Sequence, residues 1–133
     1  MTERRAKYKT ANQPKGSEHN EQCALFDWAE KLEYKYPELG LMFAIPNGGH
    51  RHKSVAARLK DEGVRAGVPD IFLPAAHCNW HGLFIELKYG RNKPTRLQQN
   101  WLDALTEAGY LAVVCWGWEE AAALIESYLE DNE

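Results

Sequence analysis

The sequence predicts an α/β fold in which helices flank a mixed four-stranded sheet. Three observations lead to this prediction. Four short apolar runs bounded by turn residues are typical of strands, four segments carry apolar residues at helical spacing, and the two kinds alternate as α-β-α-β-β-α-β-α. With 133 residues, 44% of them hydrophobic, the chain is long enough for one domain with a real core.

The first helix is expected from Ser17, which can cap it, to about residue 36, because Leu25, Trp28 and Leu32 recur at helical spacing. The apolar run "LMFAI" before "PNGG" is typical of a buried strand followed by a turn. The other elements are expected in this order: a helix over 54–63, strands over 70–74 and 83–88, a helix from 94 or 95 to 108, a strand over 110–117 and a helix over 118–130.

The net charge of −3 hides an uneven distribution. Residues 119–133 carry six acids and no base, whereas basic residues gather in the N-terminal arm, in 51–65 and in 88–96. Such clusters are compatible with a polyanion partner, although solvated surface faces would look the same. We expect a basic arm at 1–16, one domain at 17–130 and an acidic tail at 131–133.

The composition also indicates the compartment. No apolar run approaches the roughly 18 residues that span a bilayer, and the first residues lack the apolar centre of a secretory signal. The three cysteines are far apart and odd in number, which favours a reducing environment over a disulfide framework. A cytoplasmic protein is therefore expected.

Three charged residues interrupt the two central apolar runs: Asp70, Glu86 and Lys88. If Pro74 and Gly82 face each other across the intervening loop, antiparallel pairing puts Asp70 directly opposite Glu86. Glu86 and Lys88 are two residues apart, so they share one face of their strand. Two carboxylates and an ammonium group then converge. The alternative without a catalytic role is a hairpin whose charged face is exposed to solvent, with Lys88 simply paired with Glu86.

Two close carboxylates must share a proton, shift their pKa or hold a cation. All-oxygen ligands suit Mg²⁺ or Mn²⁺, and such an ion polarises a phosphoryl oxygen and activates water. A neighbouring lysine could orient or deprotonate that water, or stabilise developing negative charge. The pattern therefore favours phosphodiester hydrolysis.

These residues resemble a known signature. "VPD" with Asp70, followed by "IELK" with Glu86 and Lys88, resembles the PD-(D/E)XK nuclease motif. More broadly, residues 17–126 resemble a stand-alone virus-type replication-repair nuclease (VRR-NUC) domain. The resemblance rests on five blocks in order: "SEHNEQCALFDWA", "FAIPNGG", "GVRAGVPDIFLP", "GLFIELK" and "LQQNWLDALTEAGYLAVVCWGWEEA".

The resemblance implies a restriction-endonuclease-like core and DNA cleavage that depends on Mg²⁺ or Mn²⁺. Asp70 and Glu86 would be metal ligands, with the Leu87 carbonyl as a further ligand and Lys88 as the catalytic lysine. We expect neither an organic cofactor nor a membrane partner.

The family pattern also has a first-helix glutamate followed four residues later by Gln or Glu. Glu18 with Gln22 fits it, but Glu21 also lies near the inward face, and periodicity does not separate the two. Outside the family pattern, Glu18 would be a first-turn acid favoured by the helix dipole. Gln98, three residues before Trp101, matches a family glutamine expected to approach the metal or the scissile phosphate; otherwise it would face solvent.

The "PNGG" segment is either a simple turn or, by the resemblance, a loop beside the active site whose Asn47 touches DNA. Trp80, in the hairpin loop, is a further candidate for DNA or partner contact. A zinc site at His77, Cys78 and His81 is disfavoured, because a fourth ligand at a recognised spacing is missing. The remaining candidate DNA contacts are His50, Arg51, His52, Lys53 and Arg65.

By the resemblance, the expected function is a structure-selective DNA endonuclease that acts on branched DNA such as four-way junctions, in repair, as a homodimer. Two alternatives stay open. The chain could be a nuclease for flaps, nicks or linear duplex ends, or a non-catalytic DNA-binding accessory protein. The paired acids at Asp70 and Glu86 argue against the accessory role, because a pure binder has no need of carboxylates near phosphate.

Overall fold

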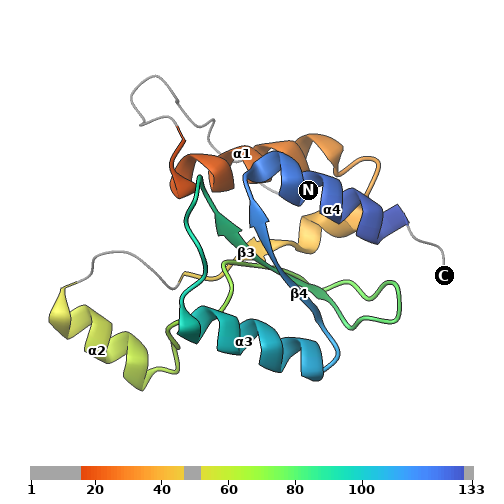
Figure 1. The fold of residues 1–133 in the computed structure, drawn as a ribbon. Helices are drawn as coiled ribbons and strands as arrows, with labels where there is room; N and C mark the ends of the chain where they lie inside the picture. Colours follow the sequence, from red (N-terminus) through yellow and green to blue (C-terminus); the bar gives the residue numbers. More distant parts are fainter. Residues whose placement is uncertain (1–15, 47–51, 131–133) are drawn as a thin grey trace.

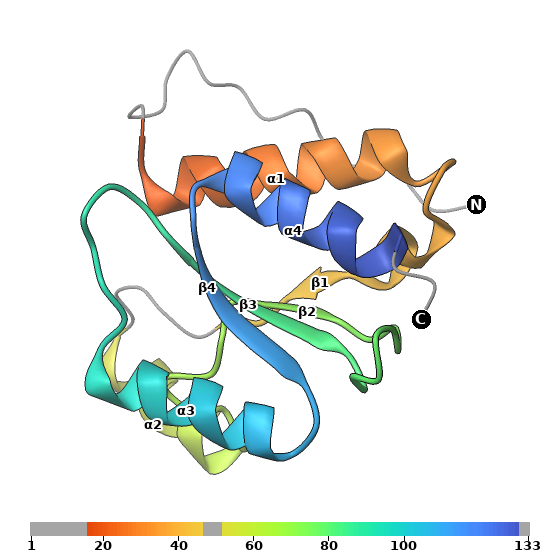
Figure 2. The same ribbon diagram turned by 45° about the vertical axis from the view of Figure 1, so that its right-hand side comes forward.

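The structure is a computed structural model that describes residues 16–46 and 52–130. It confirms the predicted α/β class: a four-stranded sheet carries α1 and α4 on one face and α3 on the other (Figures 1 and 2). The elements in chain order are α1 (Glu18–Leu32), the 3₁₀ helix η2 (Pro37–Leu41), β1 (Phe43–Ala44), α2 (Lys53–Asp61), β2 (Ile71–Leu73), β3 (Leu83–Lys88), α3 (Arg96–Glu107), β4 (Leu111–Trp116) and α4 (Trp118–Glu130).

The strand order is β1-β2-β3-β4, and the sheet is mixed. β1, β2 and β3 are antiparallel neighbours, whereas β4 runs parallel to β3 after the crossover through α3. Ile71 pairs with Ile85 and Leu73 with Leu83. This is the register that was expected from the facing positions of the hairpin loop, so Asp70 precedes β2 at the position opposite Glu86.

The helix starts follow from local side-chain chemistry. Ser17 is in an extended conformation and its hydroxyl accepts a hydrogen bond from the Asn20 N–H, which satisfies one of the open donors of the first turn. Thr95 and Gln98 form a reciprocal capping box at the start of α3. α1 ends at Leu32, earlier than expected, and the chain then turns into η2.

The core lies between the sheet and the layer of α1 and α4. Alternate residues of β3 point into it, because successive side chains of a strand face opposite sides. The fully buried members include Leu25 of α1, Ile125 of α4 and, from the sheet, Ile71, Leu73, Leu83, Ile85 and Leu87.

The prediction of a buried strand over 41–45 is wrong in extent and in burial. Leu41 belongs to η2, and the strand contains only Phe43 and Ala44, both exposed. The physical reason is position: β1 is the outer strand of the sheet, so one of its edges has no neighbour among the described residues. Met42, just before it, is the buried residue of this run.

α2 differs from the other helices because none of its nine residues is buried. It stands away from the sheet, beside the α3 side of the molecule (Figure 1). Among the helices the structure describes, none is both long enough and apolar enough to cross a membrane.

Candidate active site

The carboxylate of Asp70 is fixed at the entry to β2. Its Oδ2 accepts a hydrogen bond from the Leu87 N–H at 2.9 Å, and its carbonyl accepts one from the Ile45 N–H at 2.7 Å. The side chain is thus tied to β3 and the backbone is tied to the end of β1. Asp70 cannot shift without breaking contacts to both neighbouring strands.

The segment that leads into Asp70 is held against α3. The Trp101 indole N–H donates to the Ala66 carbonyl at 3.1 Å. Gly67 has φ +91°, and a Cβ there would lie 2.7 Å from Leu97 Cγ, so glycine is required both for the conformation and for the close approach. This packing fixes the position from which the chain enters β2.

Glu86 and Lys88 lie side by side on the face of β3 that is turned away from α1 and α4. Lys88 Nζ is 3.5 Å from Glu86 Oε2, and the two residues are only 7% and 1% exposed. Glu86 Oε1 is buried and has no hydrogen-bond partner among the described residues. A buried carboxyl oxygen without a partner costs free energy, which makes this residue a candidate for holding a ligand.

Burial dominates the electrostatics of the two acids. It raises the pKa of Glu86 to about 8, with a further increase from the negative charge of Asp70 and an opposing effect of Lys88. Burial also raises the pKa of Asp70, and the Leu87 N–H hydrogen bond partly offsets this. The free protein therefore holds a proton at this pair near neutral pH, which is the behaviour expected of close carboxylates without a cation.

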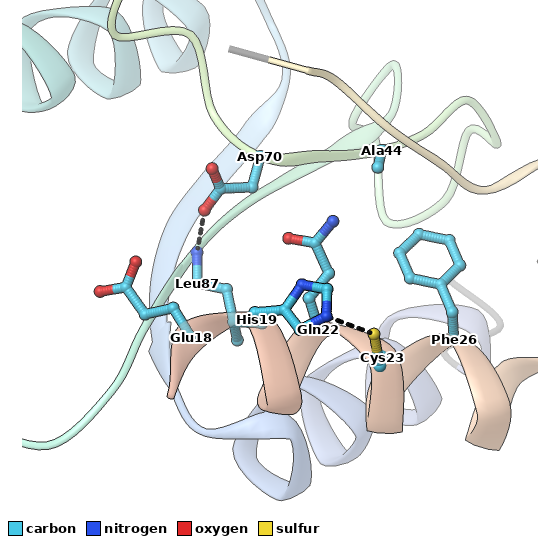
Figure 3. Close-up of a pocket in the computed structure, with 8 residues that line it drawn as sticks. All are labelled: Glu18, His19, Gln22, Cys23, Phe26, Ala44, Asp70 and Leu87. Carbon is cyan, nitrogen blue, oxygen red and sulfur yellow. Dashed lines mark hydrogen bonds between the residues drawn. The ribbon is translucent and has the colours of Figure 1, made fainter. Parts of the chain in front are cut away.

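A cavity of about 380 Å³ opens beside Asp70, between the start of α1 and the sheet (Figure 3). Glu18 and Asp70 lie at one end of it, and Phe26 and Ala44 lie at the other. Its lining consists of Glu18, His19, Gln22, Cys23 and Phe26 from α1, and Ala44, Asp70 and Leu87 from the sheet side.

The structure separates the two glutamates that periodicity could not. Glu18 lines the cavity, and its Oε2 accepts a hydrogen bond from Asn92 Nδ2 at 3.2 Å. Glu21 is turned toward α4, where its Oε1 accepts a hydrogen bond from the Trp118 N–H at 2.8 Å. Glu21 thus satisfies a donor at the start of α4, and Glu18 is the acid placed near Asp70.

Other predicted residues lie in different surroundings. The side-chain oxygen of Gln98 accepts a hydrogen bond from the Thr95 N–H at 2.9 Å, and Gln98 is not among the residues that line the cavity. His52 caps α2, accepting at Nδ1 from the Ser54 N–H. Lys53 and Arg65 are exposed. Asn47, His50 and Arg51 lie outside the described residues.

The hairpin tip contributes to packing. Trp80 pairs with His77 in a single bridge and packs against the core, partly buried. His77 Nε2 lies 3.1 Å from Glu38 Oε2, and Cys78 Sγ contacts the Tyr128 carbonyl at 3.6 Å. The partners of His77 and Cys78 therefore lie in different elements.

Sequence reasoning missed four cavity residues and one contact. Phe26 could have been found, because it continues the i, i+4 series of Glu18 and Gln22 along α1. His19, Cys23 and Ala44 carried no comparable signal. Asn92, which holds Glu18, comes from a loop far away in sequence, so no local pattern pointed to it.

The donor set fits a hard divalent cation in kind. Asp70 and Glu86 offer carboxylate oxygens, and one oxygen of Glu86 lacks a partner. In a strand the N–H and C=O of one residue point to the same side, so the Leu87 carbonyl is directed toward Asp70 as its N–H is. Across residues 16–46 and 52–130 no three His, Cys, Asp or Glu side chains form a ready metal cluster. The two acids therefore need a backbone carbonyl, water or a shift of Glu18 to complete a site.

The chain is similar to proteins of one known family. Residues 16–118 match the family model described as VRR-NUC domain. Among solved structures, a chain named VRR_NUC domain protein superimposes with a TM-score of 0.74 at 30% sequence identity, covering 86% of this chain and 91% of that one. No curated protein matches the chain significantly.

Proposed function

The chain belongs to the VRR-NUC family, and from this premise we propose that it is a divalent-metal-dependent DNA endonuclease that prefers branched DNA such as four-way junctions. Membership of the family implies a nuclease of the PD-(D/E)XK type with DNA as substrate. One observation carries the proposal for this chain: Asp70, Glu86 and Lys88 are held together, and a buried oxygen of Glu86 lacks a partner.

The proposed metal ligands are Asp70, Glu86, the Leu87 carbonyl and Glu18. A bound Mg²⁺ or Mn²⁺ would polarise the phosphoryl oxygen and lower the pKa of the attacking water. The protein's contribution is to hold the acids at fixed positions: Leu87 orients Asp70, and Asn92 orients Glu18. Hydrogen bonds of this kind, made to the side chains that would bind the metal, keep those side chains in a productive geometry.

Lys88 is the proposed catalytic lysine. Its ammonium group is buried and is held 3.5 Å from Glu86 Oε2. From there it can donate a hydrogen bond to the attacking water or to a phosphate oxygen as negative charge develops. Gln98 is proposed to contact the phosphate through its amide nitrogen, because its side-chain oxygen already caps α3.

DNA contacts are proposed for the segment between β1 and α2, for α2 itself and for Arg65, which follows α2. The exposed side chains of Lys53 and Arg65 can contact phosphates without any rearrangement of the core. The candidates between β1 and α2 are Asn47, His50, Arg51 and His52. Such contacts carry little sequence information, which agrees with selection by DNA shape.

A homodimer would place two active sites on either side of the two-fold axis of a junction. β4 is the outer strand of the sheet on the side opposite β1, and its sequence "LAVVCW" contains no charged residue. Uncharged outer strands are the ones that pair with other chains. We therefore propose β4 as part of the dimer interface, which equilibrium sedimentation of the full chain would test.

The decisive experiment compares cleavage of labelled four-way junction, flap, nicked and linear DNAs in Mg²⁺ or Mn²⁺. Lys88→Ala is expected to lower the rate by at least about 100-fold, as for the loss of a proton-transfer or charge-stabilising group. Lys35→Ala, which removes an exposed lysine paired with Glu130, is the matched control and should cleave normally.

The substrate panel separates the alternatives. Paired symmetric nicks in the junction support a dimeric resolvase, whereas cleavage of flaps or linear ends retains the nuclease and rejects the junction preference. DNA binding without metal-dependent cleavage of any substrate would reject the enzyme in favour of an accessory protein.

A further inference from the structure

One wall of the cavity carries ligands of a different kind from the carboxylates. His19 and Cys23 are four residues apart on α1 and therefore lie on adjacent turns of the same helix face. Cys23 Sγ is 3.7 Å from His19 Nε2, and the two side chains point toward each other across the front of the cavity (Figure 3). Neither residue has a part in the proposed cleavage reaction.

The separation of these two atoms matches that of a metal-chelating pair. Zinc bonds to histidine nitrogen at about 2.0–2.1 Å and to cysteine sulfur at about 2.3 Å, with tetrahedral angles, which puts nitrogen and sulfur about 3.6 Å apart. The 3.7 Å observed here therefore needs almost no rearrangement of the helix. Chelation would replace the proton that these two atoms share.

Ligand chemistry distinguishes this pair from Glu18 and Asp70, the acids that line the same cavity. Imidazole and thiolate select Zn²⁺ and similar borderline-soft ions, whereas carboxylates and carbonyls suit Mg²⁺ and Mn²⁺. Two kinds of ion would thus bind at different positions in one cavity, because Asp70 and Glu18 line it as well.

We propose that His19 and Cys23 form a second metal site, which binds Zn²⁺ or a similar divalent ion and completes its coordination with water. Two protein ligands give far less binding free energy than the four of a structural zinc site, so we expect much weaker binding than at such a site. Such a site responds to changes in the concentration of the ion and does not support the fold.

The test uses Co²⁺ as a spectroscopic substitute for zinc with the full chain. Thiolate coordination gives cobalt an intense near-ultraviolet charge-transfer absorption, and Zn²⁺ should abolish it by displacing cobalt. Cys23→Ser should remove the absorption, and His19→Ala should weaken cobalt binding at least about tenfold. Cys78→Ser is the matched control, because Cys78 contacts the Tyr128 carbonyl far from the cavity, and it should bind cobalt as the natural chain does.

Two results would overturn the site: a natural chain without the thiolate absorption, or an absorption that survives Cys23→Ser. Circular dichroism of each variant separates loss of the site from loss of the fold.

Zinc bound at His19 and Cys23 should also affect DNA cleavage, an expectation that rests on the proposed function. A zinc ion in the cavity that Asp70 also lines adds a second divalent charge there, so zinc should inhibit Mg²⁺-dependent cleavage by the natural chain. Cys23→Ser should not be inhibited when its rate is compared with its own zinc-free rate. Zinc binding without inhibition of an active nuclease would reject the regulatory effect. Zinc binding by a chain that cleaves no DNA would reject the proposed function instead, because the cobalt spectrum does not depend on cleavage.

Discussion

The two ends of the β2–β3 hairpin use the same strands and the same register for opposite purposes. Near the loop, the Phe72 and Phe84 rings stack with centroids 4.2 Å apart, and Tyr110 packs edge-on against Phe84 at 5.3 Å. Two residues further along the same face, the pair becomes Asp70 and Glu86. One end is apolar and closely packed, and the other is acidic and buried.

The comparison teaches how a small sheet holds an unfavourable site. Stacked aromatic rings contribute favourable free energy beyond the area that they bury. A buried carboxylate costs free energy, and the pKa of Glu86, raised to about 8, is the sign of that cost. Because both ends share one register, the aromatic pair helps to fix the position of the acids.

The largest expected effect is on stability at the aromatic end. Phe84→Ala removes the stacked ring and should lower the free energy of unfolding by about 3 kcal/mol, as for other aromatic truncations. Urea unfolding measures this. Tyr34→Ala, at a ring that is 84% exposed, is the control and should change stability by less than about 0.5 kcal/mol. A loss below about 1 kcal/mol at Phe84 would mean that the aromatic pair does not support the hairpin.

The sequence anticipated the parts of the fold that depend on local patterns. The bounds of β3 and α4 agree with the apolar runs that predicted them, because central strands and amphipathic helices carry strong periodic signals. β1 was the exception. Its apolar letters suggested burial, but burial of an outer strand depends on what covers it, and that is a property of the whole fold.

The part of the site that depends on the β2–β3 register could be predicted from the sequence. The loop ends at Pro74 and Gly82 placed Asp70 opposite Glu86, and the structure has that pairing. Helical periodicity could not separate Glu18 from Glu21, and only the family spacing favoured Glu18, because the geometry that separates them depends on where α4 begins relative to α1. Which glutamate lies near Asp70 is decided by the distances between α1 and its neighbouring elements. The periodicity of one helix carries no information about those distances.

The second prediction concerns the acidic end and its pH dependence. In the metal-free folded protein Glu86 keeps its proton up to pH about 8, whereas the unfolded carboxyl loses it near its ordinary value of 4.5. Between these values the folded state binds more protons than the unfolded state, so the free energy of unfolding should fall as pH rises toward 8. The raised pKa of Asp70 acts in the same direction, and Lys88 opposes both.

Glu86→Gln tests this assignment, because the amide keeps the shape of the side chain but cannot ionise. Urea unfolding in EDTA at several pH values should show a shallower slope for the variant and a higher stability than the natural chain above pH 8. Equal slopes for the two proteins would show that Glu86 is not the group that titrates.

The smallest expected effect concerns Glu18 and Glu21, two acids of α1. Like the two ends of the hairpin, they belong to one element but have different surroundings. Glu21→Ala removes the carboxylate that accepts from the Trp118 N–H. It should cost about 1 kcal/mol of stability, as for the loss of a helix cap, and leave the cleavage rate unchanged. Glu18→Ala should do the reverse: a stability change within about 0.5 kcal/mol and, if the proposed ligand role is right, a loss of cleavage that added Mn²⁺ partly restores. Thermal unfolding and junction cleavage of both variants give the four values needed. Of these two acids, Glu18 lines the cavity and Glu21 does not. Equal losses of cleavage in the two variants would therefore mean that α1 supports the fold of the site and supplies no ligand.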